Sequence, residues 1–222
     1  MLKKIKTVTI TQYDYIIRNF QDEELDIHGH PHHFNEFNEA GQPLREIKYD
    51  RQGGFEEMFT YEYNEKGFLV KETYYPEEEM AAEDTTFEEN EMGLPGKSIK
   101  HYLDGSVDTT TFFYDEQQRL IRKVTTSEDE EPEEETFEYE EVADVVQESE
   151  VEENANHRIT RNEKGQVVLE EIYSDEEELV TKIERKFNEE GNPMEVEIYI
   201  DGQGKTLTRH YYLQYEYSYF SD

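Results

Sequence analysis

Cysteine is absent from this chain of 222 residues, and long apolar runs are absent as well. Without cysteine the chain can form no disulfide and offers no thiolate, which fits a reducing compartment. No stretch approaches the roughly 18 consecutive apolar residues that indicate a membrane-spanning helix. The basic start of the chain is followed by no apolar run of the length that a secretory signal needs. We therefore expect a cytoplasmic protein.

Basic residues are scarce. Lysine and arginine together number 22, against 56 aspartates and glutamates, which gives a formal net charge of −34. A surface this negative repels the phosphates of DNA, RNA and anionic membranes. We expect neither a nucleic-acid nor a membrane partner, which leaves basic proteins, cations or water alone.

Aromatic residues are abundant, although apolar residues as a whole are not. Hydrophobic residues make up 34% of the chain and charged residues 35%, a balance that can accompany disorder. Seventeen tyrosines and twelve phenylalanines are too many for a solvated polyelectrolyte, and both residue types favour strands. No segment of about 12 residues shows the apolar stripe of a helix. The composition predicts a folded all-β protein.

A short motif, Asn-Glu-x-Gly or a close variant, recurs along the chain. Asn or Asp at the first place of a turn can bond the backbone two residues on, and Gly at the fourth place permits a positive φ. The motif therefore predicts a tight hairpin turn. Its first residues are Asn38, Asn64, Asn90, Asp115, Asn162 and Asn188, at spacings of 26, 26, 25, 47 and 26.

The flanks of the motif alternate as β-strands do, with Phe59, Tyr61 and Tyr63 at every second position before one turn. Counting the long spacing as two periods gives about eight hairpin units of about 25 residues, with atypical units at the ends. We predict a single β-repeat domain over residues 1–222, folded as an antiparallel meander of about 15 strands. A curled sheet, a barrel and a sandwich all remain open.

The repeat resembles YD repeats, also called RHS repeats. Tyr63–Leu69 and Tyr114–Leu120 are similar to the core of that family, which is Tyr-Asp, two residues, then Gly-Arg-Leu. Asn usually replaces Asp here, Arg119 is the only arginine at its place, and Gln118 replaces the glycine of its unit. The resemblance implies a β-rich repeat fold, in a family known for shells that encapsulate toxin domains.

Acidic residues concentrate in the segments between hairpins. Because the strands of a meander alternate in direction, we expect tight turns on one rim and longer acidic connectors on the other. One interpretation is solvated loops that keep a tyrosine-rich sheet soluble and block edge pairing. The other is an anionic surface that steers a basic partner. The partner-binding residues predicted by this second interpretation are Glu77, Glu78, Glu79, Glu128, Asp129, Glu130, Glu131, Glu133, Glu134, Glu135, Asp175, Glu176 and Glu177.

Signals for catalysis, metals and cofactors are weak. Four histidines lie close together: His28, His30, His32 and His33. Imidazole suits zinc, nickel or copper, but Gly29 and Pro31 predict a flexible loop without fixed ligand geometry. Gly93–Ser98 ends in Gly-Lys-Ser, as a phosphate-binding loop does. The first glycine of such a loop would fall at position 91, which is Glu91 here. We expect no metal, no cofactor and no catalytic residue set.

Three function hypotheses remain. The first is an acidic protein-binding module, in its most specific form an immunity or antitoxin-like protein that masks a basic partner. The second is a structural or surface repeat protein without a dedicated ligand. The third is a carboxylate-dependent hydrolase, which requires a few buried acids with a raised pKa. We favour the first hypothesis because of the charge and, by analogy, the toxin association of YD repeats.

Overall fold

The computed structural model describes residues 3–19, 24–128, 130–139, 156–201 and 209–221. All regular elements among them are β-strands, and they include no helix of the length and hydropathy needed to cross a lipid bilayer. The strands are β1 (Ile5–Asn19), β2 (Glu24–Phe37), β3 (Pro43–Tyr49), β4 (Phe55–Tyr63), β5 (Leu69–Tyr75), β6 (Glu83–Glu89), β7 (Pro95–Tyr102), β8 (Val107–Tyr114), β9 (Leu120–Thr126), β10 (Glu133–Thr136), β11 (His157–Arg161), β12 (Val167–Tyr173), β13 (Leu179–Phe187), β14 (Pro193–Ile200) and β15 (Arg209–Tyr219).

These strands form one antiparallel sheet in the order β10 to β1, followed by β15 to β11. Each hairpin therefore lies beside the next, except that β1 pairs with β15 through residues such as Ile10 and Tyr215. The predicted all-β meander of about 15 strands is confirmed. The sheet order ends at β10 and at β11, so the described strands do not close into a barrel.

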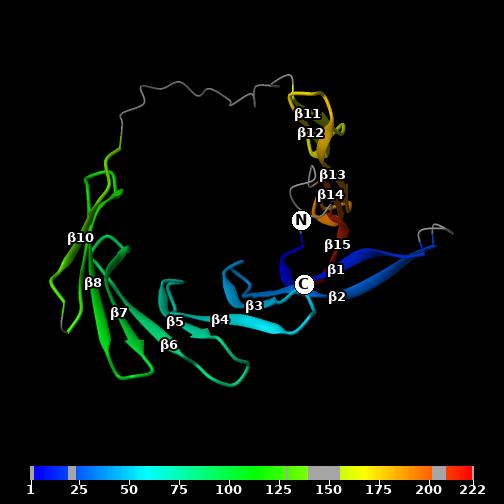
Figure 1. The fold of residues 1–222 in the computed structure, drawn as a ribbon. Coiled ribbons are helices and arrows are strands. Elements are labelled where there is room, and N and C mark those ends of the chain that lie inside the picture. The colour runs from blue at the N-terminus through cyan, green and yellow to red at the C-terminus, as the bar shows by residue number, and fades with distance from the viewer. Residues whose placement is uncertain (1–2, 20–23, 129, 140–155, 202–208, 222) are drawn as a thin grey trace. The chain divides into compact units, whose positions relative to one another are not determined.

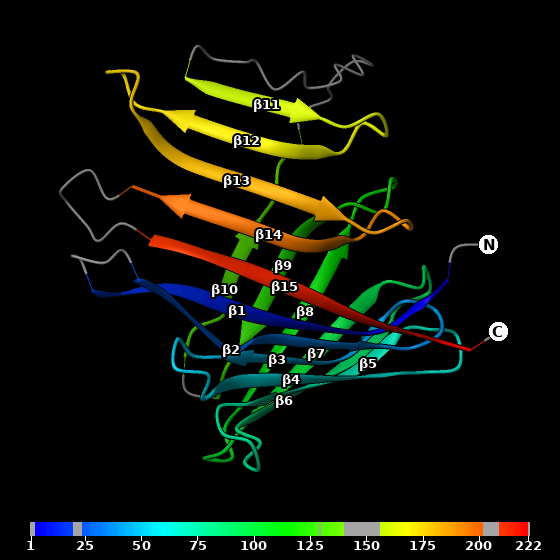
Figure 2. The same cartoon turned by 90° about the vertical axis from the view of Figure 1, so that its right-hand side faces the viewer.

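The chain divides into two compact units, which we describe separately. The first unit contains β1, β2 as far as His33, β11 to β15 and the turn Asp50–Gly54. Figure 2 shows its strands β11 to β14 side by side with alternating directions. The second unit contains the end of β2 from Phe34 and strands β3 to β10, and Figure 1 shows β4 to β8 following one another across it. The single domain stays a prediction.

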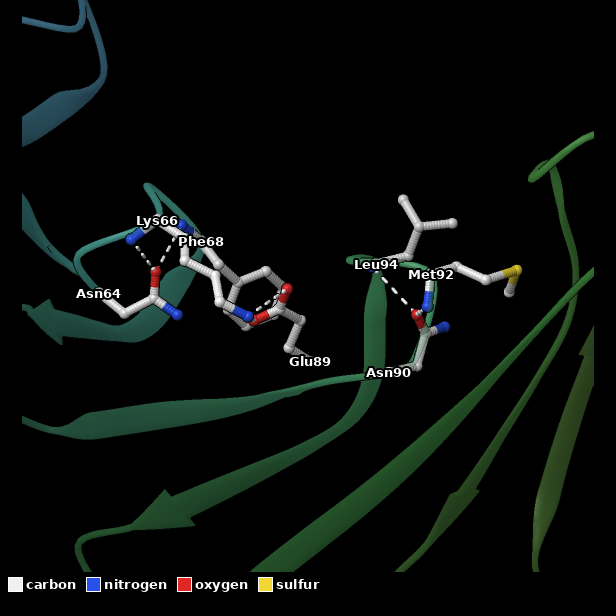
Figure 3. A network of polar contacts seen from close by, with 7 residues as sticks. All are labelled: Asn64, Lys66, Phe68, Glu89, Asn90, Met92 and Leu94. Carbon is white, nitrogen blue, oxygen red and sulfur yellow. Dashed lines mark hydrogen bonds and ion pairs between the residues drawn. The ribbon is translucent and has the colours of Figure 1, made fainter.

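A five-residue turn joins many of the hairpins, and its first side chain holds it together. In Asn64–Phe68 the Asn64 Oδ1 accepts hydrogen bonds of 3.0 Å from the backbone amides of Lys66 and Phe68 (Figure 3). The Gly67 amide bonds the Asn64 carbonyl at 2.9 Å, and Gly67 has a φ of 83°. The predicted turn chemistry is confirmed. Asn38, Asn90, Asp115 and Asn162 accept the same pair of bonds.

The same turn also occurs at three places where the sequence predicted longer connectors between hairpin units, one of them acidic. Asp50 begins a copy between β3 and β4 and accepts bonds of 2.8 Å from the amides of Gln52 and Gly54. Tyr102–Ser106 and Ser174–Glu178 have the same backbone bonds. The prediction of long connectors is wrong at these three places. The turn needs a left-handed fourth residue rather than the Asn-Glu pair by which the motif was recognised.

Neighbouring turns of one unit also bond each other. In the second unit the Gln42 Nε2 donates to the Gly67 carbonyl at 2.7 Å. In the first unit the Gln166 Nε2 donates to the Gly191 carbonyl at 3.0 Å. Each of these bonds joins residues 25 positions apart. This separation equals the period of the sequence repeat, so equivalent turns of neighbouring repeats contact each other.

The described strands form a single layer in each unit, with little core. Val196 is their one buried apolar side chain, at 9% exposed, and none of their side chains is less than 2% exposed. In the first unit the register places Ile10, Val196, Leu213 and Tyr215 on one face. Aromatic side chains are thus half-buried by their neighbours within the sheet. Most described side chains of the strands are therefore partly exposed.

Candidate binding site on the second unit

Four adjacent strands, β4 to β7, place two rows of side chains on one face of the second unit. Direct cross-strand partners, and residues two positions apart along a strand, share a face of a sheet. The first row is Phe59, Tyr74 and Glu83, and the second row is Glu72, Thr85 and Lys100. Thr85 is the shortest of these side chains and lies between Glu72 and Lys100 in the register.

These six side chains and Glu57 line a hollow of about 480 Å³. The rings of Phe59 and Tyr74 form one wall, with centroids 5.0 Å apart and planes tilted by 37°. The short Thr85 side chain leaves space that a longer residue would fill. The sheet therefore offers a recess that combines an aromatic pair with carboxylates.

Two of the three carboxylates in the hollow have basic partners. The Lys100 Nζ lies 2.6 Å from the Glu83 Oε2, and the Lys48 Nζ lies 3.5 Å from the Glu57 Oε1. Both acids are 30% exposed. Lys48 is shared, because its Nζ lies closer to the Glu56 Oε1, at 3.0 Å. Each acid thus has a basic neighbour within the second unit, although partial exposure keeps each pair weak.

Glu72 is the third carboxylate, and it makes no hydrogen bond or ion pair within the described part of the chain. Burial raises the pKa of Glu72, the charge of Lys100 opposes this effect, and the charge of Glu46 adds to it. Tyr61, its cross-strand neighbour, donates its hydroxyl to the Glu46 Oε2 at 2.8 Å instead. The pKa of Tyr61 is raised by burial and by this bond. A cation placed beside Glu72 would stabilise its ionised form.

Of the predicted acidic residues, Glu77–Glu79 lie beside this hollow along the chain. They form the connection between β5 and β6, which carry Tyr74 and Glu83. The Ala82 amide closes this connection with a 2.9 Å bond to the Tyr74 carbonyl. All three glutamates are exposed and have no ion pair among the described residues.

A second group of predicted residues lies at the connection between β9 and β10. Glu128, Glu130 and Glu131 are exposed and likewise unpaired in the described residues, whereas Asp129 lies outside them. In a meander the β5–β6 and β9–β10 connections fall on the same rim. The structure therefore brings these two acidic groups to one rim of the second unit.

The other predicted acids differ from these two groups. Glu133, Glu134 and Glu135 lie in strand β10 rather than in a loop. The Lys123 Nζ lies 2.6 Å from the Glu135 Oε2 across β9 and β10, and the Arg122 Nη1 lies 3.6 Å from the Glu134 Oε1. In the first unit, Asp175, Glu176 and Glu177 lie in the tight turn between β12 and β13 and are exposed.

The histidine cluster lies in strand β2, so the prediction of a flexible loop is wrong. Gly29 fits there because the Tyr13 ring covers it, leaving only 2.6 Å between a Cβ at Gly29 and the Tyr13 Cε1. His30 is 5% exposed, and its Nε2 lies 3.0 Å from the Asp14 Oδ2. Nowhere in the described ranges do three His, Asp or Glu side chains form a group suited to a metal ion. The pairing of His30 indicates a structural role.

The first unit contains a carboxylate in a contrasting environment. The Glu170 Oε2 lies 2.8 Å from the Arg185 Nη2, and the Glu170 Oε1 lies 3.1 Å from the His157 Nε2. The bond from Arg185 lowers the pKa of Glu170, burial opposes this effect, and the bond from His157 supports it. Both oxygens of Glu170 are therefore satisfied from within the sheet.

The sequence did not predict the hollow, because it arises from cross-strand register. Register shifts between Glu62 and Tyr63, and between Glu88 and Glu89, decide which residues of β4 to β7 lie opposite each other. A turn prediction accurate to one residue would have been needed to align the strands. The signal that could have found the site is the aromatic and acidic alternation of Glu57, Phe59 and Tyr61.

No protein-family model matches the chain, and no curated protein matches it in sequence. Among solved structures, a porin-like protein from Bacteroides uniformis is 11% identical with a TM-score of 0.41, over 96% of this chain and 98% of that one. A Tc holotoxin pore from Photorhabdus luminescens is 9% identical with a TM-score of 0.35, over 76% of this chain and 11% of that one. A TcdB2–TccC3 structure is 10% identical with a TM-score of 0.21, over 78% and 13%.

Proposed function

We propose that the chain is an acidic protein-binding module that masks a basic partner through the rim of its second unit. The carrying observation is the exposed and unpaired state of six glutamates at two connections of that rim. They are Glu77, Glu78, Glu79, Glu128, Glu130 and Glu131. Clustered like charges attract a cationic surface from a distance and repel other anionic proteins. The single-layer sheet supports this proposal, because most side chains of the strands beside the rim are partly exposed.

In its more specific form, the proposal is an immunity or antitoxin-like protein in the cytoplasm. The motif around Asn64 and Asp115 resembles YD repeats, and that family is associated with toxins. This step is an analogy of family, so membership among YD repeats is itself part of the proposal. A structural repeat protein without a ligand is the alternative, and it predicts that loss of rim charge changes no interaction.

A test uses the full chain as bait in lysate of its native host, at low and at high ionic strength. The rim variant is Glu77→Gln, Glu78→Gln, Glu79→Gln, and the matched control is Glu163→Gln, Glu189→Gln, Glu190→Gln, which removes the same charge from exposed turns of the first unit. We expect wild type and control to retain one basic protein at low ionic strength. With the purified partner, association to the rim variant should be about tenfold slower or more.

Equal association of the two triple variants, or binding that does not depend on ionic strength, would contradict the proposal. The absence of any specific partner at either ionic strength would favour the structural alternative.

A carboxylate-dependent hydrolase is a second candidate, and the raised pKa of Glu72 favours it. The other two acids of the hollow, Glu57 and Glu83, already have lysine partners. The hollow therefore lacks a second unpaired carboxylate for paired acid–base chemistry. We rank binding first. If the wild-type protein hydrolyses a substrate and the Glu72→Gln variant does not, the hydrolase would rank above the binding module.

A further inference from the structure

We propose that the hollow on the second unit binds an arginine side chain of the basic partner, with the guanidinium between the Phe59–Tyr74 rings and the Glu72 carboxylate. This inference rests on the proposed function and specifies its recognition site. The hollow of about 480 Å³ falls within the range of pockets that hold small ligands, about 300–1,000 Å³. It has room for one side chain and part of the backbone that carries it.

Basic residues already stack on aromatic rings elsewhere in the second unit. The Arg122 guanidinium carbon lies 4.0 Å from the Phe113 ring centre, and that of Arg119 lies 4.7 Å from the Tyr139 ring centre. The Phe59–Tyr74 pair has no such cation among the described residues, although it lies beside an acidic residue. The cation of the hollow, Lys100, lies 4.8 Å from the Tyr102 ring centre instead, so the Phe59–Tyr74 pair lacks, among the described residues, the stacked cation that other rings of this unit have.

The carboxylates of the hollow favour one additional positive charge. Glu83 is paired with Lys100, and Glu57 shares Lys48 with Glu56, so Glu72 alone makes no hydrogen bond or ion pair among the described residues. A guanidinium can donate two parallel bonds to a carboxylate and can lie flat on an aromatic ring. An ammonium group can do only part of this, which favours arginine over lysine. A metal ion is disfavoured, because the described acids and histidines form no group suited to hold one.

The acidic rim gives a basic partner a route to the hollow. Glu77–Glu79 connect directly the two strands that carry Tyr74 and Glu83. They are exposed, so they would attract a basic segment before any contact forms in the hollow. The rim would then raise the association rate of the partner, and the hollow would lower its dissociation rate.

The probe for this site is the peptide acetyl-Gly-Arg-Gly-amide, titrated into the isotope-labelled full chain at low ionic strength and followed by NMR. The control peptide contains citrulline, which has nearly the shape of arginine without its charge. The test variant is Glu72→Gln, and the matched control is Glu62→Gln, which removes an exposed charge from the opposite face of β4. Both variants should give the dispersed spectrum of a folded sheet, since neither residue has a partner to lose.

We expect saturable shifts of the ring signals of Phe59 and Tyr74 with the arginine peptide and not with the citrulline peptide. Glu72→Gln should weaken binding about fivefold or more, because a charged hydrogen bond is lost, and Glu62→Gln should weaken it less than about twofold. Equal weakening in both variants, equal binding of both peptides, or shifts spread over the acidic surface would overturn the inference. Loss of partner binding in the rim variant alone would then leave the proposed function intact.

Discussion

Glu72 in the second unit and Glu170 in the first unit are both half-buried glutamates on a sheet face, yet their environments shift the pKa in opposite directions. Glu170 receives bonds from Arg185 at 2.8 Å and His157 at 3.1 Å. Glu72 receives none from the described residues and is next to aromatic rings and Thr85. A chain with 56 acids and 22 basic residues cannot pair every acid, so the location of its few basic residues distinguishes structural carboxylates from available ones.

This difference separates two uses of the same residue type. A half-buried carboxylate bonded to an arginine stabilises the native state. A half-buried carboxylate without a partner destabilises it, and such a group is expected where a ligand supplies the missing charge. The comparison therefore predicts opposite effects of the same substitution in the two units.

The largest effect is expected from Glu170→Gln, which should destabilise the native state by about 1–3 kcal/mol, because charged hydrogen bonds are lost. The pKa of Glu170 is lowered by folding, so its stabilisation is present above the unfolded value of about 4.3 and is lost as the pH falls through the folded value. Urea denaturation at neutral and at acidic pH measures this difference. The variant should be less stable than wild type at neutral pH and equally stable at acidic pH, where the wild-type carboxyl group is protonated.

The matched control for this change is Glu171→Gln, the next residue along β12, which lies on the opposite face and has no ion pair in the described chain. It should change stability by less than about 0.5 kcal/mol. If the urea midpoints of the two variants coincide, the Glu170 network does not stabilise the fold as the comparison requires.

A smaller effect of opposite sign is expected from Glu72→Gln. Folding raises the pKa of Glu72, so the native state binds its proton at pH values where the unfolded chain has released it. Stability is therefore lost as the pH rises from about 4.3 through the folded value, and glutamine avoids this loss. Thermal unfolding should show the variant more stable than wild type at neutral pH and equal to it under acidic conditions. A lower melting temperature at neutral pH would contradict the absence of a partner for Glu72.

The fold could be predicted from the sequence much further than the site could. Asn64 and Gly67 identify a turn that depends on five consecutive residues. The repeat, the strands and the meander could therefore be predicted from local sequence. The hollow depends on Thr85 lying opposite both Glu72 and Lys100, which requires the register of three strands at once. Charge runs show where acids are numerous, but not that Glu135 has a lysine partner and Glu79 has none.

The smallest effect on stability is expected from Thr85→Arg, which would supply Glu72 with a cation from its direct cross-strand neighbour. The change should make the environment of Glu72 resemble that of Glu170, and it should add at most about 1 kcal/mol of stability because the pair is partly exposed. The sharper measurement is an NMR titration of the Glu72 carboxyl carbon, whose pKa should fall relative to wild type. The same variant should no longer bind the arginine peptide, because the guanidinium of the new side chain fills the hollow. A Glu72 pKa that stays unchanged in Thr85→Arg would mean that the hollow does not hold a guanidinium beside this carboxylate, and the contrast between the two glutamates would then come from burial alone.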